Sequence, residues 1–270
     1  MSRNHHITLR FDPYGIFIKS ATPVGLYARK KWLGRKDDGP YQRAFDNTVG
    51  SLLEGQLPNG SWNRSFIDTV RRLFGLHLTI RYATDPINRA LDWLFHELMT
   101  ADQQEGQPEL DLEGLPFVQG GLHPLHRGMA LFLATVFGRE NDPEVVALYH
   151  SLSQRILEDE GIWDRSGDVS NMLRALVVHP VYAKTNATAR IAEGLSDIQE
   201  DSGIWAGSFP FYMTVNALAH LDTPPAEKQL EKAFVLLSRT QNQDGTWGST
   251  EAEWNTFLVV HAMRNKKILR

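Results

Sequence analysis

Two histidines three residues apart form the most distinctive short stretch of this sequence. His123 and His126 lie in the segment Gly-Leu-His-Pro-Leu-His-Arg, where a spacing of three can place both side chains on one face of a helix. Imidazole nitrogens bind metals when a carboxylate completes the site, and they also relay protons or act as general bases. Pro124, between them, indicates the first turn of a helix or a loop. A purely structural pair is the alternative, and we predict no bound metal and no cofactor.

Three carboxylates, Asp68, Asp168 and Glu253, each follow a tryptophan closely and stand at the start of an apolar segment. Burial raises the pKa of a carboxyl group, so an acid facing an apolar cavity stays undissociated and can protonate a carbon–carbon double bond. Helix capping, or interaction with the positive end of a helix, is the alternative role of each acid. The candidate catalytic residues are therefore these three acids, followed by His126.

Aromatic and basic side chains near these acids are candidates for binding a substrate. An aromatic face attracts a cation by about 0.5–2 kcal/mol, and arginine forms paired hydrogen bonds with a phosphate or a carboxylate. Core packing of the aromatic rings and solvation of the arginine are the alternatives. The predicted substrate-binding residues are Phe66, His123, Arg127, Phe211, Tyr212 and Trp254.

Composition excludes several classes of protein. The chain has 270 residues, a net charge of −4 and no cysteine. This charge argues against a dedicated nucleic-acid binder, and the lack of cysteine excludes disulfides, a thiol nucleophile and zinc–thiolate sites. The N-terminus lacks the apolar core of a signal peptide, and no apolar run approaches the ~20 residues of a membrane span. We expect a cytoplasmic protein, with peripheral membrane contact left open.

A short motif recurs along the chain: a glutamine, a turn centred on glycine, and a tryptophan. Segments 56–62 and 241–247 match best, 199–205 is a third copy and 157–163 is a weaker fourth. The tryptophans of the last three copies are spaced 42 residues apart, and the 101-residue gap after the tryptophan of the first copy predicts a degenerate copy near 119–121. A fixed period of this size is typical of repeat architectures. We expect these residues to join helices rather than to touch a substrate.

The segments between the copies have helical periodicity of two kinds. Amphipathic segments, which we expect to form outer helices, cover about 87–99, 143–156, 185–198 and 226–240. More uniformly apolar segments, which we expect to be buried inner helices, cover 66–78, 129–137, 169–178, 211–221 and 254–263. A possible earlier pair covers 23–33 and 41–53, and residues 7–18 could form a strand.

The repeated Gln-x-x-Asp/Asn-Gly-x-Trp pattern resembles the QW motif of squalene–hopene and oxidosqualene cyclases and of protein prenyltransferase β subunits. The resemblance extends from about residue 40 to the C-terminus. It implies an α/α toroid, in which outer helices surround a ring of inner helices and a central apolar cavity. We therefore predict an all-α single domain over 1–270, with about five to six inner/outer helix pairs and an N-terminal extension, 1–21, that is irregular or β.

Departures from the family pattern bear on the chemistry. Cyclases of this kind protonate an alkene with an Asp-x-Asp-Asp motif, which is absent here; Ile67 stands where the donating aspartate would be. Zinc prenyltransferases and other cysteine-dependent toroids are excluded by composition. The resemblance implies a terpene cyclase-like enzyme that cyclises a prenyl or polyene substrate, its small-molecule isoprenoid partner, by an acid-initiated route.

Two alternatives to the cyclase remain open. One is a polysaccharide lyase-like, sugar-active toroid, which would use a histidine or tyrosine base and an arginine that neutralises a uronate. The other is a non-catalytic toroid that binds a prenyl chain, an acyl chain or a partner. A closed aromatic chamber with one buried acid would favour the cyclase, whereas an open groove with histidine and arginine would favour sugar chemistry.

Overall fold

Helices form almost all of the regular structure. The computed structural model describes residues 7–35, 39–100 and 109–269. Within these ranges there are eleven α-helices, three short 3-10 helices and no strand. The α-helices are α1 (Pro23–Lys31), α2 (Gly39–Leu53), α3 (Phe66–Thr79), α4 (Asp85–Thr100), α5 (Leu122–Val136), α6 (Pro143–Glu158), α7 (Ser166–Val178), α8 (Asn186–Asp197), α9 (Phe211–Leu218), α10 (Pro224–Arg239) and α11 (Ala252–Asn265). The expected all-α fold is confirmed.

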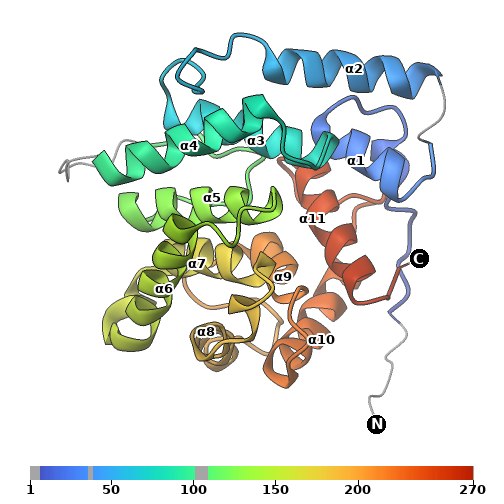
Figure 1. Cartoon of the computed structure of the whole chain (residues 1–270). Coiled ribbons are helices and arrows are strands. Elements are labelled where there is room, and N and C mark those ends of the chain that lie inside the picture. Colours follow the sequence, from blue (N-terminus) through green and yellow to red (C-terminus); the bar gives the residue numbers. More distant parts are fainter. Residues whose placement is uncertain (1–6, 36–38, 101–108, 270) are drawn as a thin grey trace.

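The odd-numbered helices form a closed ring. Each of α1, α3, α5, α7 and α9 packs against the next odd-numbered helix, and α11 packs against both α9 and α1. The even-numbered helices α2, α4, α6, α8 and α10 lie outside this ring (Figure 1). The fold is therefore an α/α toroid with six inner and five outer helices among the described residues.

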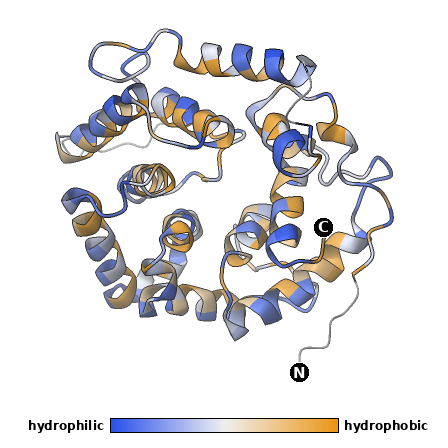
Figure 2. Cartoon of the chain, turned by 45° about the vertical axis from the view of Figure 1, so that its right-hand side comes forward, coloured by the Kyte–Doolittle hydropathy of each residue, from blue (hydrophilic) through white to orange (hydrophobic). Residues whose placement is uncertain are grey.

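Inner and outer helices differ in how much of their surface is buried, as their sequences predict. On α7, nine of thirteen residues are buried, because other helices cover it on most sides. On α8, buried residues at 187, 188, 191, 192 and 195 follow the helical repeat and leave the opposite face to solvent. Figure 2 shows this division, with hydrophilic residues more frequent on the outer helices.

Threonine, serine and proline residues fix where several helices begin. The Thr22 hydroxyl accepts a hydrogen bond from the Gly25 amide at the start of α1, and Ser65 accepts one from the Asp68 amide at the start of α3. Proline occupies the first turn of α1, α6 and α10, where the missing N–H has no partner to lose. These signals explain why the expected starts of α1, α3, α6 and α10 agree closely with the observed ones.

Two of the three good motif copies join neighbouring outer helices in the same way. The Gln56 amide donates to the Gly60 carbonyl and to the Pro86 carbonyl of α4, and Gln199 donates likewise to Gly203 and to Gln229 of α10. The glycines of these two copies, Gly60 and Gly203, have positive φ and lie against a backbone carbonyl of that next helix. The motif is therefore a joint between successive repeats.

The third joint uses the N-terminal segment instead of a helix. Gln241 donates to the carbonyls of Gly245 and Phe11, and its side-chain oxygen accepts from the amides of Arg10 and Phe11. Residues 7–18 are irregular, with one 3-10 turn at Gly15–Phe17, and they form no strand. They occupy the place where a sixth outer helix would lie.

The weaker copies depart from this pattern. Segment 157–163 enters a 3-10 helix, Glu160–Asp164, and its glycine lacks positive φ. Its tryptophan, Trp163, packs against Gly194 of α8. At 119–121 the chain leads into α5, which begins at Leu122, seven residues before the expected inner segment. Among the described residues, no helix is long and apolar enough to cross a membrane.

Candidate functional site

A cavity of about 260 Å³ lies at the centre of the ring. All six inner helices, or the residues that directly follow them, contribute to its wall, mostly from their C-terminal halves. Its aromatic residues are Tyr27, Phe74, Phe132, Trp254 and Phe257. The Trp254 ring lies 5.6 Å from that of Phe257 in a stacked arrangement and 5.8 Å from that of Phe74, edge to face.

Three histidines share this wall. The His220 and His261 rings lie 5.5 Å apart, and His77 faces the cavity from α3. Burial, with smaller contributions from Arg81 and His261, lowers the pKa of His77 to about 3. Burial, together with Arg174 and Arg81, lowers the pKa of His261 to about 4, and the pKa of His220 is lowered in the same direction. All three imidazoles are therefore neutral at physiological pH.

Two arginines add positive charge to the same cavity. Arg174 of α7 is 4% exposed, and Arg81, directly after α3, places its guanidinium 5.1 Å from the centre of the Tyr27 ring. None of the described residues that line this cavity carries a carboxylate. The expected apolar cavity is thus present as aromatic walls, but one end of it is cationic.

A second cavity of about 500 Å³ lies at the N-terminal ends of α1 and α11. It shares Phe74, Leu78 and Trp254 with the central cavity, so the two spaces adjoin at these three side chains. Its wall carries four carboxylates and one arginine: Asp111, Glu113, Glu251, Glu253 and Arg71. The axis of the ring therefore has an acidic end and a cationic end.

Glu253 is the predicted acid that lines a cavity. Its Oε2 accepts a hydrogen bond of 3.0 Å from the Thr22 hydroxyl, while its Oε1 is buried with no partner. The indole N–H of Trp254, the next residue, is also buried without a partner. Two unsatisfied polar atoms thus adjoin the wall between the cavities, and buried groups of this kind usually have a partner.

Asp68 and Asp168 line neither cavity. Asp168 is 1% exposed, accepts a short hydrogen bond from the Gly121 amide and lies 3.5 Å from the Arg165 guanidinium. Asp68 accepts a hydrogen bond from the Asn63 side chain at the start of α3. Both acids lie in the first turn of an inner helix, where a carboxylate can interact with the positive helix end.

The predicted His–Arg stretch lies in the first turns of α5, outside both cavities. His126 stacks on Phe66 with ring centres 4.2 Å apart, and its Nε2 is buried without a partner. Burial, with a contribution from His123, lowers the pKa of His126 to about 4. Arg127 is half-buried on the same helix. Among the described residues, no group of three potential metal ligands is present here or elsewhere.

Phe211 and Tyr212 lie at the start of α9, and neither lines the central cavity. Their rings lie 5.4 Å apart, and Phe211 also lies 5.8 Å from the Trp205 ring. Burial raises the pKa of Tyr212. Trp254 is therefore the predicted substrate-binding residue that the structure places in the central wall.

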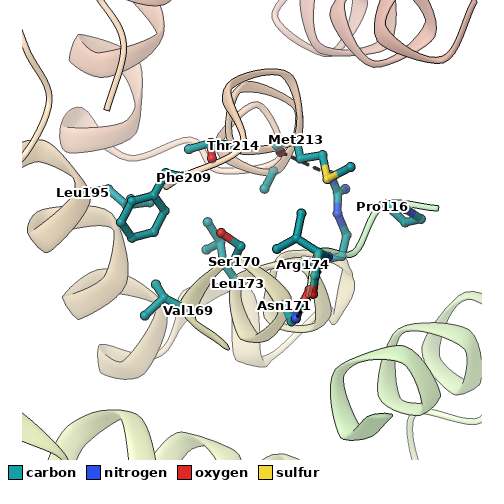
Figure 3. A pocket seen from close by; sticks show the side chains of 12 residues that line it. Pro116, Val169, Ser170, Asn171, Leu173, Arg174, Leu195, Phe209, Met213 and Thr214 are labelled. Atoms are coloured by element: carbon teal, nitrogen blue, oxygen red, sulfur yellow. Dashed lines mark hydrogen bonds between the residues drawn. The ribbon is translucent and has the colours of Figure 1, made fainter. Parts of the chain in front are cut away.

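The sequence reasoning missed the polar residues at the cationic end. They are His77, Arg81, Arg174, Asn216, His220 and His261. A signal was present, since several of them interrupt otherwise apolar inner segments, as Arg174 does between Leu173 and Ala175. Figure 3 shows Arg174 between Met213 and Pro116, beside a small cavity of about 10 Å³ that lies between α7 and α9.

Comparison with known proteins adds support for the fold. The chain is similar to a crystal structure of a protein from Actinoplanes, with a TM-score of 0.57 and 16% sequence identity over 93% of this chain and 90% of that one. No family model matches the sequence. No curated protein matches it either.

Proposed function

We propose that this protein binds an apolar polyene along the axis of the ring and cyclises it by proton transfer from Glu253. The observation that carries the proposal is the unpartnered Oε1 of Glu253, which lies next to Trp254 at the end of an aromatic-walled chamber. A proton donor and aromatic faces are the two elements that an acid-initiated cyclisation requires. The resemblance of the repeats to those of polyene cyclases supports the same chemistry.

The reaction would proceed as follows. The Glu253 carboxyl proton adds to one carbon of a terminal double bond, and the π electrons form the new C–H bond. A second double bond attacks the resulting cation and closes a carbon ring. Loss of a proton from the last cation gives a neutral cyclic isomer of the substrate, and a proton from solvent restores the acid. Trp254 and Phe74 would stabilise the cation through their ring faces.

The positions of the charges favour initiation at the Glu253 end. Glu253 and His261 belong to the same helix and are eight residues apart, which corresponds to about 12 Å along the axis. Arginine at the opposite end would repel a cation, and this separation weakens the repulsion. The carbocation is therefore best placed on the side of Trp254 that faces Glu253.

Glu253→Gln tests the proposal because it keeps the shape of the side chain and removes its proton. We expect turnover of farnesyl or geranylgeranyl substrates to fall by two to four orders of magnitude, in the range typical of a lost general acid. Asp68→Asn, which changes an acid outside both cavities, should leave turnover unchanged. Equal activity of Glu253→Gln and the parent protein would exclude Glu253 as the donor, and an inactive parent would exclude cyclisation of these substrates.

A sugar-active enzyme is the second candidate, favoured by one observation. The Asn216 amide lies 3.3 Å from Nδ1 of His261, in the cavity that also holds Arg174 and Tyr27. A polysaccharide lyase uses a histidine or tyrosine as the base and an arginine to neutralise the uronate. Release of unsaturated products from uronate oligosaccharides, lost in His261→Ala, would support this function in place of the cyclase.

A further inference from the structure

Arg174 is a buried cation that has no anionic partner among the described residues. Its guanidinium makes one hydrogen bond, of 3.4 Å, to the Met213 carbonyl, and its Nε is buried with no partner (Figure 3). No carboxylate of the described residues forms a salt bridge with it. Buried charges in proteins are normally paired, because removing a charge from water is costly. Burial also lowers the pKa of Arg174 to about 10, which still leaves it charged at neutral pH.

The neighbours of Arg174 are hydrogen-bond donors rather than acids. Nδ1 of His261 faces the side-chain amides of Asn216 at 3.3 Å and Asn265 at 3.5 Å. Because those amide nitrogens donate, Nδ1 is the acceptor, and the ring proton lies on Nε2. His261 therefore contributes an N–H donor from a ring that lines the cavity. Arg81 contributes a second guanidinium that forms no salt bridge with a described carboxylate.

We propose that the cationic end of the central cavity binds an anionic head group, a phosphate ester or a carboxylate, with Arg174 as its main counter-charge. This inference rests on the proposed function and names its substrate class: an isoprenoid chain that carries an anionic group. The head group would lie between Arg174, His220 and His261, and the chain would pass Trp254 toward Glu253. The shared wall of the two cavities gives this orientation.

A competing explanation is that Arg174 only offsets the partial negative charge of the helix C-termini around it. The two explanations differ in ligand binding. A structural arginine would affect stability alone, whereas a ligand arginine would affect the affinity for anions more than the affinity for neutral chains. The comparison of charged and neutral ligands with the same chain therefore decides between them.

Titration calorimetry of the full chain with three farnesyl ligands tests the inference. We expect the diphosphate ester or the carboxylic acid to bind at least tenfold more tightly than the neutral alcohol, and the preferred one identifies the head group. Inorganic diphosphate should compete if the phosphate ester is preferred. Equal affinity for all three ligands would overturn the inference, and this result needs no variant.

Arg174→Met should remove the preference for the anion, with at least a tenfold loss, and leave the affinity for farnesol unchanged. Arg174→Lys should retain part of the preference for the anion, since lysine keeps the positive charge but lacks the paired N–H donors of the guanidinium. Arg81→Met, at an exposed position, provides a second variant if Arg174→Met does not fold, and it should also reduce the preference. Arg43→Met on α2, which lines no cavity described above, is the control and should change neither affinity.

The head-group site and the cyclase activity can fail independently of each other. An Arg174-dependent preference for anions in a protein that turns over none of the ligands would support the head-group site and exclude the cyclase for them. Turnover that depends on Glu253 but shows no preference for anions would exclude the head-group site and leave the cyclase intact. Unchanged anion affinity in Arg174→Met would assign Arg174 to the structural role.

Discussion

Neutral histidines buried beside arginines make the cavity sensitive to acid. His77, His220 and His261 line one space with Arg81 and Arg174, so protonation of any of them adds positive charge where there is already an excess. The described lining contains no carboxylate that could offset it. Burial is the main reason why each of the three pKa values lies below that of free histidine, and the nearby positive charge lowers them further.

The free energy of unfolding should decrease as pH falls from about 6.5 to about 4. Unfolded histidine has a pKa of 6.5, whereas the folded pKa is about 3 for His77 and about 4 for His261. Between these values the unfolded chain binds more protons, so stability rises with pH and is fully regained above 6.5. His77→Gln should flatten the dependence in urea titrations, and His150→Gln, at an exposed position on α6, should not. A slope unaffected by His77→Gln would assign the acid sensitivity to other groups.

Glu253 could be identified from the sequence because it closely follows a motif tryptophan, and a residue in that place lies at the start of an inner helix. The same reasoning also selected Asp68 and Asp168, which lie at equivalent sequence positions and line neither cavity. An inner helix is buried on most sides, so its periodicity does not show which residues face the axis. Arg174 and His77 were missed for this reason.

At the scale of elements, the joints between repeats explain why the expected helices agree with the observed ones. Glycine is required in each joint because φ is positive and a carbonyl of the next outer helix, or of Asp12 in the third joint, lies against it. This requirement is visible in the sequence as Asn-Gly, Ser-Gly and Asp-Gly before a tryptophan. The start of α5 was missed because residues 119–121 contain no such joint, and Gly120 and Gly121 pack against Asp168 instead.

Gly60→Ala should destabilise the protein more than Gly55→Ala. Both glycines have positive φ, where a side chain costs about 1–2 kcal/mol. A Cβ at Gly55 would have no neighbour within 4 Å, whereas one at Gly60 would lie 2.2 Å from the Arg89 carbonyl oxygen. Chemical denaturation should therefore show a loss at least twice as large for Gly60→Ala. Similar losses would mean that the backbone conformation alone matters and that α4 moves freely.

The whole molecule is a ring that closes where the first inner helix, α1, packs against the last one, α11. The 42-residue period predicted a repeat architecture and its approximate number of repeats, because each repeat buries its apolar face only against its neighbours. The resemblance of the motif implied that these repeats form a toroid. The period could not predict how the ring closes, since Gln241 bonds to the N-terminal segment, which has no helical repeat of its own. The N-terminal segment supplies the missing contact, and Phe17, fully buried, anchors it in the core.

Closure of the ring should depend on Gln241. Its side chain makes four hydrogen bonds, three of them to Arg10 and Phe11, about 230 residues away in sequence. Gln241→Ala leaves these backbone groups without partners, at a cost of about 2–4 kcal/mol in the free energy of unfolding. Amide exchange over residues 10–17 should accelerate as the segment detaches.

Gln42→Ala provides the matched control for this closure. Gln42 bonds to Asp46 on the surface of α2, so its replacement should change neither stability nor exchange by a measurable amount. If Gln241→Ala lowers stability while exchange at residues 10–17 stays slow, Phe17 and its core contacts hold the segment without the glutamine. Fast exchange in that segment alone, with the helices still protected, would show that the six inner helices form a ring that persists after its outer closure opens.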